Sequence, residues 1–240
     1  MTNDIIPSVA DMVAADYRKA YVFRQFGIDF YCDGKKTLAE ACAEKNLDQA
    51  VLELALTQAS VKPAGSIYWN FQQWDLAFLI DFIVNAHHAY IRAQIPRIRV
   101  YGEKVRQVDG QKWPEVIQIH ALTQRLADEL LRHLEKEERV PFPYIQNLVA
   151  ARQYRQKKPA APFGQMQNPI SAMELEHESA SQMLQDIRRL SNDYTPPADA
   201  GNSFRVWYAL LQEFEEDQQL HIHLENNILF PSALALEEAA

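Results

Sequence analysis

Cysteine is scarce in this chain of 240 residues. Only Cys32 and Cys42 are present, and both lie in the first fifth of the sequence. Two cysteines are too few for the disulfide framework of a small secreted protein, so we expect a reducing, cytoplasmic location. The N-terminus has no basic segment followed by an apolar one, and Asp81 interrupts the longest apolar run, residues 76–84. Neither export nor insertion into a membrane is therefore indicated.

The sequence also has few glycines and no excess of basic residues. Seven glycines, few runs of β-branched residues and a hydrophobic fraction of 48% favour an all-α fold. Lysine and arginine number 24 against 32 aspartates and glutamates, which gives a net charge of −8. Because a surface that binds phosphates needs a basic excess, nucleic acid is not an expected partner.

Two segments repeat one pattern, H-x3-E-x4-F-P. The first begins with His133 and Glu137 and ends at residues 142–143, and the second begins with His221 and Glu225 and ends at residues 230–231. Residues four apart lie on the same face of a helix, so each segment directs an imidazole and a carboxylate to one place. The pattern predicts half of a metal site, present twice.

Two further histidines extend the repeat. Intervals of 45, 44 and 44 residues separate His88, His133, His177 and His221. About 25 residues of helix plus a connection fill such an interval, which predicts four helices in up-down order with one of these histidines on each. His177 falls near the start of its helix and His133 and His221 near the ends of theirs, so antiparallel packing brings them to one level.

A segment rich in proline and glycine, residues 61–66, divides the chain. We predict a small helical N-terminal domain over residues 1–62 and a four-helix bundle over residues 70–236. Gly27 can end a helix in the left-handed conformation, Thr37 and Glu40 match a capping box, and Asp48 can cap a further helix. The predicted helices are 9–26, 37–46 and 48–60, then 74–108 with a kink at Pro96, 114–139, 169–192 and 203–229. Residues 151–164 are expected to form a solvated connection.

Four imidazoles and two carboxylates are the donors that two metal ions need if Glu137 and Glu225 bridge them. Nitrogen and oxygen donors without thiolate suit iron or manganese, and zinc is also compatible. Six protein groups leave coordination positions open for bridging solvent or an oxo group and for a small ligand. The other histidines, His87, His120 and His223, are expected to be packed or solvated. Ligand histidines usually donate their second N–H to a carboxylate or carbonyl, and the candidates for this role are Glu174, Glu178, Glu213 and Glu216. A place on a solvated helix face is the commoner role of such residues.

These segments resemble the iron-sulfur cluster repair di-iron proteins, also called repair of iron centres proteins, of the hemerythrin-like group. The resemblance covers nearly the whole chain and rests on residues 81–90, 133–143, 176–178 and 221–231, the last being the most specific. It implies a hemerythrin-like bundle with two iron ions bridged by an oxo group. The ligands that it implies are His88, His133, Glu137, His177, His221 and Glu225. His87 and His88 are adjacent, and the seven-residue step from Asp81 favours His88.

The resemblance implies a cytoplasmic protein that restores iron-sulfur clusters damaged by nitric oxide or peroxide, by donating iron. Its implied partners are damaged iron-sulfur proteins and small ligands such as nitric oxide, peroxide or dioxygen. The family's small domain carries adjacent cysteines before a glycine pair, whereas this chain has Tyr31, Cys32, Asp33 and Gly34, so Cys32 alone is left to pass iron or act in redox chemistry. Two alternatives remain open, namely dioxygen or nitric oxide binding by the bundle alone, and reduction of nitric oxide. The sequence also leaves open whether the chain forms a homodimer.

Overall fold

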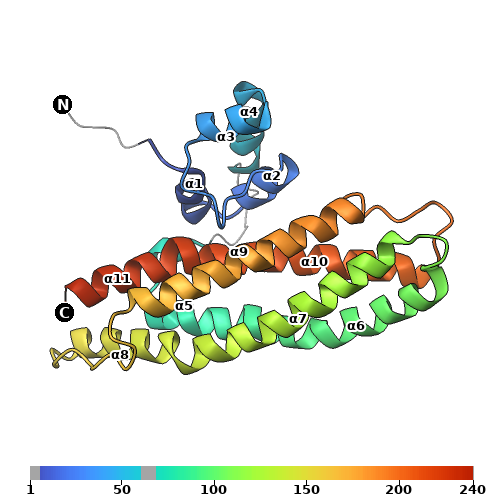
Figure 1. Cartoon of the computed structure of the whole chain (residues 1–240). Helices are drawn as coiled ribbons and strands as arrows, with labels where there is room; N and C mark the ends of the chain where they lie inside the picture. Colours follow the sequence, from blue (N-terminus) through green and yellow to red (C-terminus); the bar gives the residue numbers. More distant parts are fainter. Residues whose placement is uncertain (1–5, 61–68, 240) are drawn as a thin grey trace.

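A computed structural model describes residues 6–60 and 69–239. The predicted linker, residues 61–66, lies outside the described residues. All regular structure in the described part is helical, as the composition predicts, and four long helices form a bundle with smaller helices on one side (Figure 1). None of the described helices is both long enough and apolar enough to span a bilayer.

The N-terminal part consists of four short helices, α1 (Val9–Ala15), α2 (Lys19–Gln25), α3 (Leu38–Lys45) and α4 (Gln49–Ser60). The capping box at Thr37 and Glu40 is present, and Asn46 ends α3 in the left-handed conformation. Gly27 has a φ of 66° just after α2. The predicted single helix 9–26 is wrong, because it breaks at Asp16. There the Asp16 carboxylate accepts hydrogen bonds from the backbone and guanidinium of Arg18, and such local bonds compete with helical ones.

The bundle consists of α6 (Ala89–Asp109), α7 (Glu115–Arg139), α9 (Gln167–Leu190) and α10 (Asn202–Leu224). Helix α6 packs against α7 and α10, and α7 packs against α9. Three further helical segments continue these helices, of which the first lies within the predicted helix 74–108 and the other two lie beyond the predicted ends at 139 and 229. They are α5 (Leu76–Phe82) before α6, α8 (Pro141–Gln153) after α7, and α11 (Phe230–Glu238) after α10. Val140 leaves helical geometry between α7 and α8, and the loop predicted at 151–164 begins only after α8.

Two π-helical turns interrupt the bundle helices, η2 (Ile83–His88) and η3 (Glu225–Leu229). Helix α6 continues through Pro96, and the π-helical turn η2 comes directly before it. Each π-turn contains or adjoins residues of the repeated histidine pattern, and such turns are frequent at functional sites.

A layer of buried polar residues separates two apolar cores in the bundle. One core contains Ile91, Leu134 and Phe214, and the other contains Ile83, Phe142 and Leu229. The four spaced histidines lie between these cores along each helix. A third apolar cluster belongs to the N-terminal helices, and Ile222 of α10 is part of it, which fixes those helices against the bundle.

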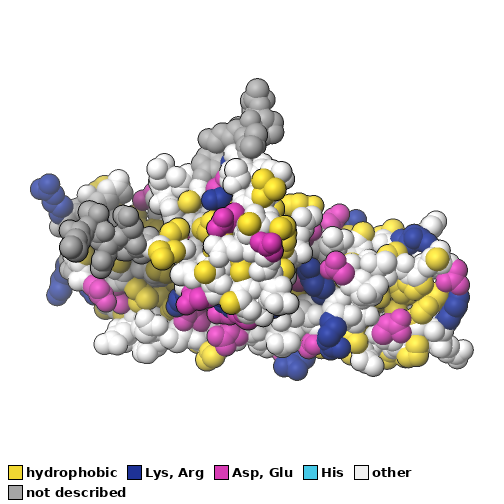
Figure 2. All heavy atoms as spheres, turned by 90° about the horizontal axis from the view of Figure 1, so that it is seen from above, with side chains coloured by type: hydrophobic (Ala, Val, Ile, Leu, Met, Phe, Trp, Pro, Cys, Tyr) yellow, Lys and Arg dark blue, Asp and Glu magenta, His cyan; other side chains and the backbone are white. Residues whose placement is uncertain are grey.

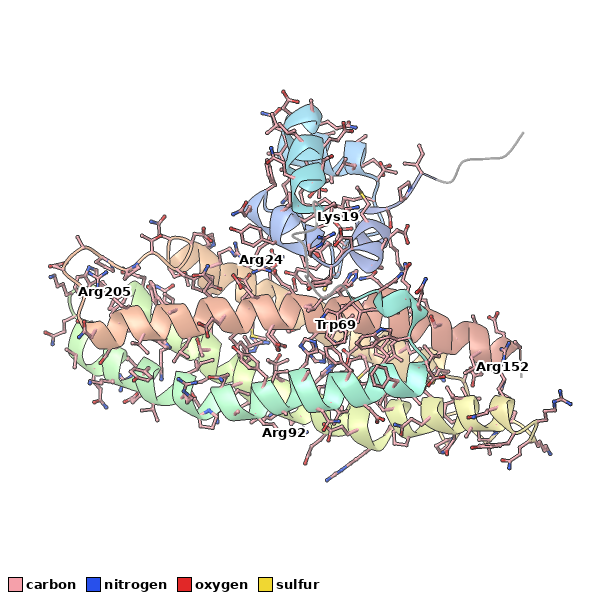
Figure 3. All side chains as sticks on the ribbon, turned by 180° about the vertical axis from the view of Figure 1, so that it is seen from behind. Lys19, Arg24, Trp69, Arg92, Arg152 and Arg205 are labelled. Carbon is pink, nitrogen blue, oxygen red and sulfur yellow. The ribbon has the colours of Figure 1, made fainter. Side chains whose placement is uncertain are left out.

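Polar contacts complete this junction. Arg24 of α2 approaches Glu216 of α10 at 2.6 Å, and Figure 3 shows Arg24 where the N-terminal helices meet the bundle. The face that carries these helices has acidic, basic and apolar side chains interspersed (Figure 2).

Candidate metal centre

Six buried side chains meet in the polar layer between the two apolar cores. They form two groups of four, in each of which the ligand atoms lie within 4.8 Å of one another. One group contains His88 and His221, the other contains His133 and His177, and both contain Glu137 and Glu225. The structure thus brings together all six residues that the sequence analysis singled out as metal ligands. None of the six is more than 3% exposed.

The two glutamates each face both histidine pairs. Glu137 directs Oε2 to Nε2 of His88 at 3.4 Å and Oε1 to Nε2 of His133 at 3.2 Å. Glu225 directs Oε1 to Nε2 of His221 at 3.0 Å and Oε2 to Nε2 of His177 at 3.2 Å. One oxygen of each carboxylate therefore points at each histidine pair.

Three of the four histidines are fixed by a hydrogen bond from Nδ1. His88 donates to Glu138 at 2.7 Å, and His133 donates to Glu176 at 2.8 Å. His177 donates to Oδ1 of Asn226 at 2.8 Å, while the Nδ2 group of Asn226 donates to the carbonyl of Tyr31. A proton on Nδ1 leaves Nε2 with its lone pair directed at the centre, as metal ligation requires.

The outer partners differ from those that the sequence suggested. Glu138, Glu176 and Asn226 accept hydrogen bonds from the histidines, and Glu174, Glu178, Glu213 and Glu216 do not. Each true partner is the immediate sequence neighbour of a ligand. Such a neighbour points about 100° away from the ligand on its own helix, so it reaches the histidine of an adjacent helix. This was the signal available in the sequence.

The polar atoms of the centre fit a cation and little else. The Nε2 atoms of His88 and His221 lie 3.2 Å apart, and those of His133 and His177 lie 2.9 Å apart, so that at most one nitrogen of each pair can carry a proton between them. Both oxygens of Glu137 and Oε2 of Glu225 are buried without a hydrogen-bond partner. Two buried carboxylates and facing lone pairs are costly unless positive charge lies between them.

The pKa values point the same way. Burial lowers the pKa of His88 and His133. Hydrogen bonds and charge interactions with nearby carboxylates, above all Glu137, outweigh burial and raise the pKa of each imidazole to about 10. The pKa of Glu225 is held well below its ordinary value by His221 and the other imidazoles, against the effect of burial. Without a metal, protons on His88 and His133 therefore offset the charge of the carboxylates, and a bound cation could take their place.

Comparison with known families agrees with this geometry. Residues 79–233 match the model of the hemerythrin HHE cation binding domain, and residues 7–60 match ScdA_N, a domain of unknown function. The chain is 37% identical over 227 residues to proteins named iron-sulfur cluster repair protein YtfE from Musicola paradisiaca (strain Ech703) and Yersinia pestis (strain Pestoides F), with 95% of this chain and 96% of each relative covered. The chain belongs to this hemerythrin-like repair family.

The phenylalanine at the end of each repeated motif packs on a histidine of the centre. Phe142, which follows the α7 ligands, stacks on His88 with ring centres 5.7 Å apart and planes inclined by 19°. Phe230, which follows the α10 ligands, stacks on His177 at 6.3 Å and 6°. Each repeat thus supplies a histidine to one pair and an apolar cover to a histidine of the other pair.

The other histidines of the hemerythrin domain lie outside the two groups. His87 bonds through Nδ1 to Asp217 at 2.8 Å and stacks on His221, so the geometry places His88, rather than His87, among the ligand atoms. His223 is buried and contacts the carbonyl of Phe30 at 3.3 Å. His120 is partly exposed beside Glu103.

Cys32 lies in the loop between α2 and α3 and is partly exposed, whereas Cys42 is buried. Burial and the charges of Asp29, Glu178 and Asp33 raise the pKa of the Cys32 thiol, against the effect of a hydrogen bond with Ser181. The preceding residue, Tyr31, is buried and accepts a hydrogen bond from Ser181 of α9 at 3.2 Å. The thiol is therefore protonated near neutral pH, and Cys32 is not among the residues that could hold an ion in the centre.

Proposed function

We propose that this protein binds two iron ions and repairs iron-sulfur clusters damaged by nitric oxide or peroxide, by donating iron. The observation that carries the metal assignment is the pair of buried ligand groups that share Glu137 and Glu225. We assign His88 and His221 to one ion, His133 and His177 to the other, and the two glutamates to both. An oxo or hydroxo bridge would complete the centre.

The donor set supports iron that can exchange. Histidine nitrogen and carboxylate oxygen suit iron without the tight closure of a thiolate cage, and four protein donors per ion leave positions open. Bound iron would supply redox chemistry and affinity for small ligands such as nitric oxide, peroxide or dioxygen. The protein's own residues orient the imidazoles through Glu138, Glu176 and Asn226, and Phe142 and Phe230 exclude water from two of them.

The repair role is supported by the relatives, which are named for it and match nearly the full length of the chain. We propose Cys32 as the residue that receives iron on its way to a client protein, because it is the more exposed of the two cysteines. Its raised pKa means that iron must displace the thiol proton. Two unpaired cysteines and labile ferrous iron are consistent with work in a reducing cytoplasm.

The first experiment is the metal content per chain of fresh protein, with its absorption spectrum before and after anaerobic nitric oxide. Two irons and an oxo-bridge band that nitric oxide changes are expected, followed by reactivation of a nitric-oxide-damaged [4Fe–4S] hydro-lyase. Iron-free protein serves as the control for reactivation. Zinc, or no metal, after expression with ample iron would overturn the proposal.

A second activity, reduction of nitric oxide, is favoured by the open positions that four protein donors leave on each ion. Two nitric oxide molecules held side by side could couple to nitrous oxide if two electrons and two protons are supplied, with water as the other product. The test is anaerobic turnover with an electron donor. Absence of nitrous oxide would remove this activity and leave iron donation.

A further inference from the structure

Asn226 differs from Glu138 and Glu176, the other residues that accept a hydrogen bond from a ligand histidine. Its side chain is neutral, and it bonds to two different parts of the chain. Its Oδ1 accepts from Nδ1 of His177 at 2.8 Å, and its Nδ2 donates to the carbonyl of Tyr31 at 3.3 Å. His88 and His133 are held instead by carboxylates, Glu138 and Glu176. A carboxylate partner makes an imidazole a stronger donor to a metal, whereas an amide does so less. His177 is therefore the weaker donor of its pair.

The loop that Asn226 contacts is anchored to the same π-turn by several bonds. Asn227 donates from Nδ2 to the carbonyls of Phe30 and Tyr31 at 3.4 and 3.1 Å. His223, one turn earlier, contacts the Phe30 carbonyl through Nδ1 and packs edge-on against the Phe30 ring at 5.7 Å. The N-terminal loop thus rests on α10 and η3 through main-chain carbonyls, directly beside the metal centre.

The order of residues in η3 makes this arrangement possible. Glu225, Asn226 and Asn227 follow one another, and they contact in turn the ligand centre, the back of His177 and the N-terminal loop. Asn226 is the one described residue that bonds both to a histidine of the centre and to the N-terminal loop through its side chain.

We infer that Asn226 is a positioning residue that couples the Phe30–Tyr31 loop to His177, so that docking of this loop controls how firmly the ion at His133 and His177 is held. The inference rests on the proposed metal binding, and it names which of the two ions is the more readily released. Because energetic coupling between two sites is reciprocal, the metal must also strengthen docking of the loop that carries Cys32.

The two halves of this coupling can be separated by two substitutions in the full chain. Asn226→Leu removes both bonds. Asn226→Asp keeps an acceptor for His177, now a carboxylate as at Glu138 and Glu176, but loses the donor to Tyr31. Asn85→Ala is a matched control, because Asn85 is an exposed asparagine of the other π-turn and bonds only to the carbonyl of Asp81.

The first readout is transfer of ferrous iron from the loaded protein to ferrozine. Asn226→Leu is expected to release one of its two irons about tenfold faster than the unmodified protein, since loss of an outer partner typically weakens metal binding by about 10 to 100-fold. Asn226→Asp should release iron no faster than the unmodified protein, and Asn85→Ala should be unchanged. Equal release from Asn226→Leu and the unmodified protein would overturn the inference.

The second readout is the rate at which iodoacetamide alkylates Cys32, with buried Cys42 as the reference for global opening. Metal loading should slow alkylation of Cys32 in the unmodified protein, and this protection should be lost in both Asn226 variants. Protection that persists in Asn226→Asp would mean that iron binds Cys32 directly, and it would overturn the coupling. Neither readout uses an iron-sulfur client, so the inference can fail or hold independently of the repair activity.

Discussion

Among single residues, Glu137 and Glu225 should matter most for metal binding, because each carboxylate faces both histidine pairs. We expect Glu225→Gln to lose most of both irons, since one neutral amide replaces an oxygen donor and a charge at each position. Metal per folded chain after gel filtration is the measurement, and Glu213→Gln, at an exposed site of α10, is the control. Full iron retention in both Glu137→Ala and Glu225→Ala would contradict the bridging assignment.

Glu138 acts on the metal only through His88, so its effect should be smaller. Glu138→Gln keeps an acceptor for Nδ1 of His88 but removes the charge that the structure places 2.7 Å away. We expect affinity to fall by about tenfold, the lower end of what outer partners contribute. Competition with a chelator measures it, and Glu135→Gln on the exposed face of α7 should bind as the unmodified protein does. A loss as large as that of Glu225→Gln would make Glu138 a ligand itself.

The six candidate ligands could be read from the sequence because helical periodicity and four evenly spaced histidines place them without knowledge of the neighbours. Asn226 could not, because its role depends on which helix and which loop face it. The same holds for Phe142 and Phe230, whose place in the repeat was visible in the sequence but whose stacking on the opposite pair's histidines depends on how the bundle closes.

At the scale of helices, α6 and α10 approach closely where Gly102 faces Trp207. A Cβ at residue 102 would lie 3.0 Å from the buried indole. Alanine gains about 1 kcal/mol over glycine in helix propensity, but overpacking a filled core costs about 1–3 kcal/mol. Because the indole is fully buried and has little room to move, we expect Gly102→Ala to destabilise the protein by about 1 kcal/mol in denaturant unfolding. In a Trp207→Phe background the same change should become neutral or stabilising, and an unaltered penalty there would show that the indole is not the obstacle.

Helix ends marked by capping residues were predictable, as at Thr37, whereas the π-turns were not. A π-turn differs from α-helix by a single extra residue, and that residue changes neither composition nor the apolar pattern over a long window. The break at Asp16 was missed for a different reason. Its cause is the pairing of Asp16 with Arg18, a local competition that the apolar pattern of residues 9–26 conceals.

At the scale of the whole molecule, the raised pKa values of His88 and His133 predict how stability depends on pH in metal-free protein. Each imidazole has a pKa of about 10 when folded, against 6.5 ordinarily, so the folded state binds protons that the unfolded state releases. The resulting stability is complete below pH 6.5 and is lost as the pH rises through 10. We expect the melting temperature of chelator-treated protein to fall between pH 6.5 and 9. Metal-loaded protein lacks these protons and should show little such fall, and equal slopes in the two forms would contradict the prediction.

The distribution of ligands along the chain has a consequence for how such a protein can be assembled. The hairpin of α6 and α7, with η2 before it and α8 after it, carries His88, His133, Glu137 and Phe142. The hairpin of α9 and α10, with η3 and α11 after it, carries His177, His221, Glu225 and Phe230. Each hairpin has two histidines, one glutamate and one covering phenylalanine, and each histidine pair takes one member from either hairpin. Two copies of a single hairpin, associating about a two-fold axis, would therefore contain every group that the centre uses. A sequence that encodes one hairpin would therefore suffice for such a centre, and pairing of two like hairpins and capture of two ions would be one event.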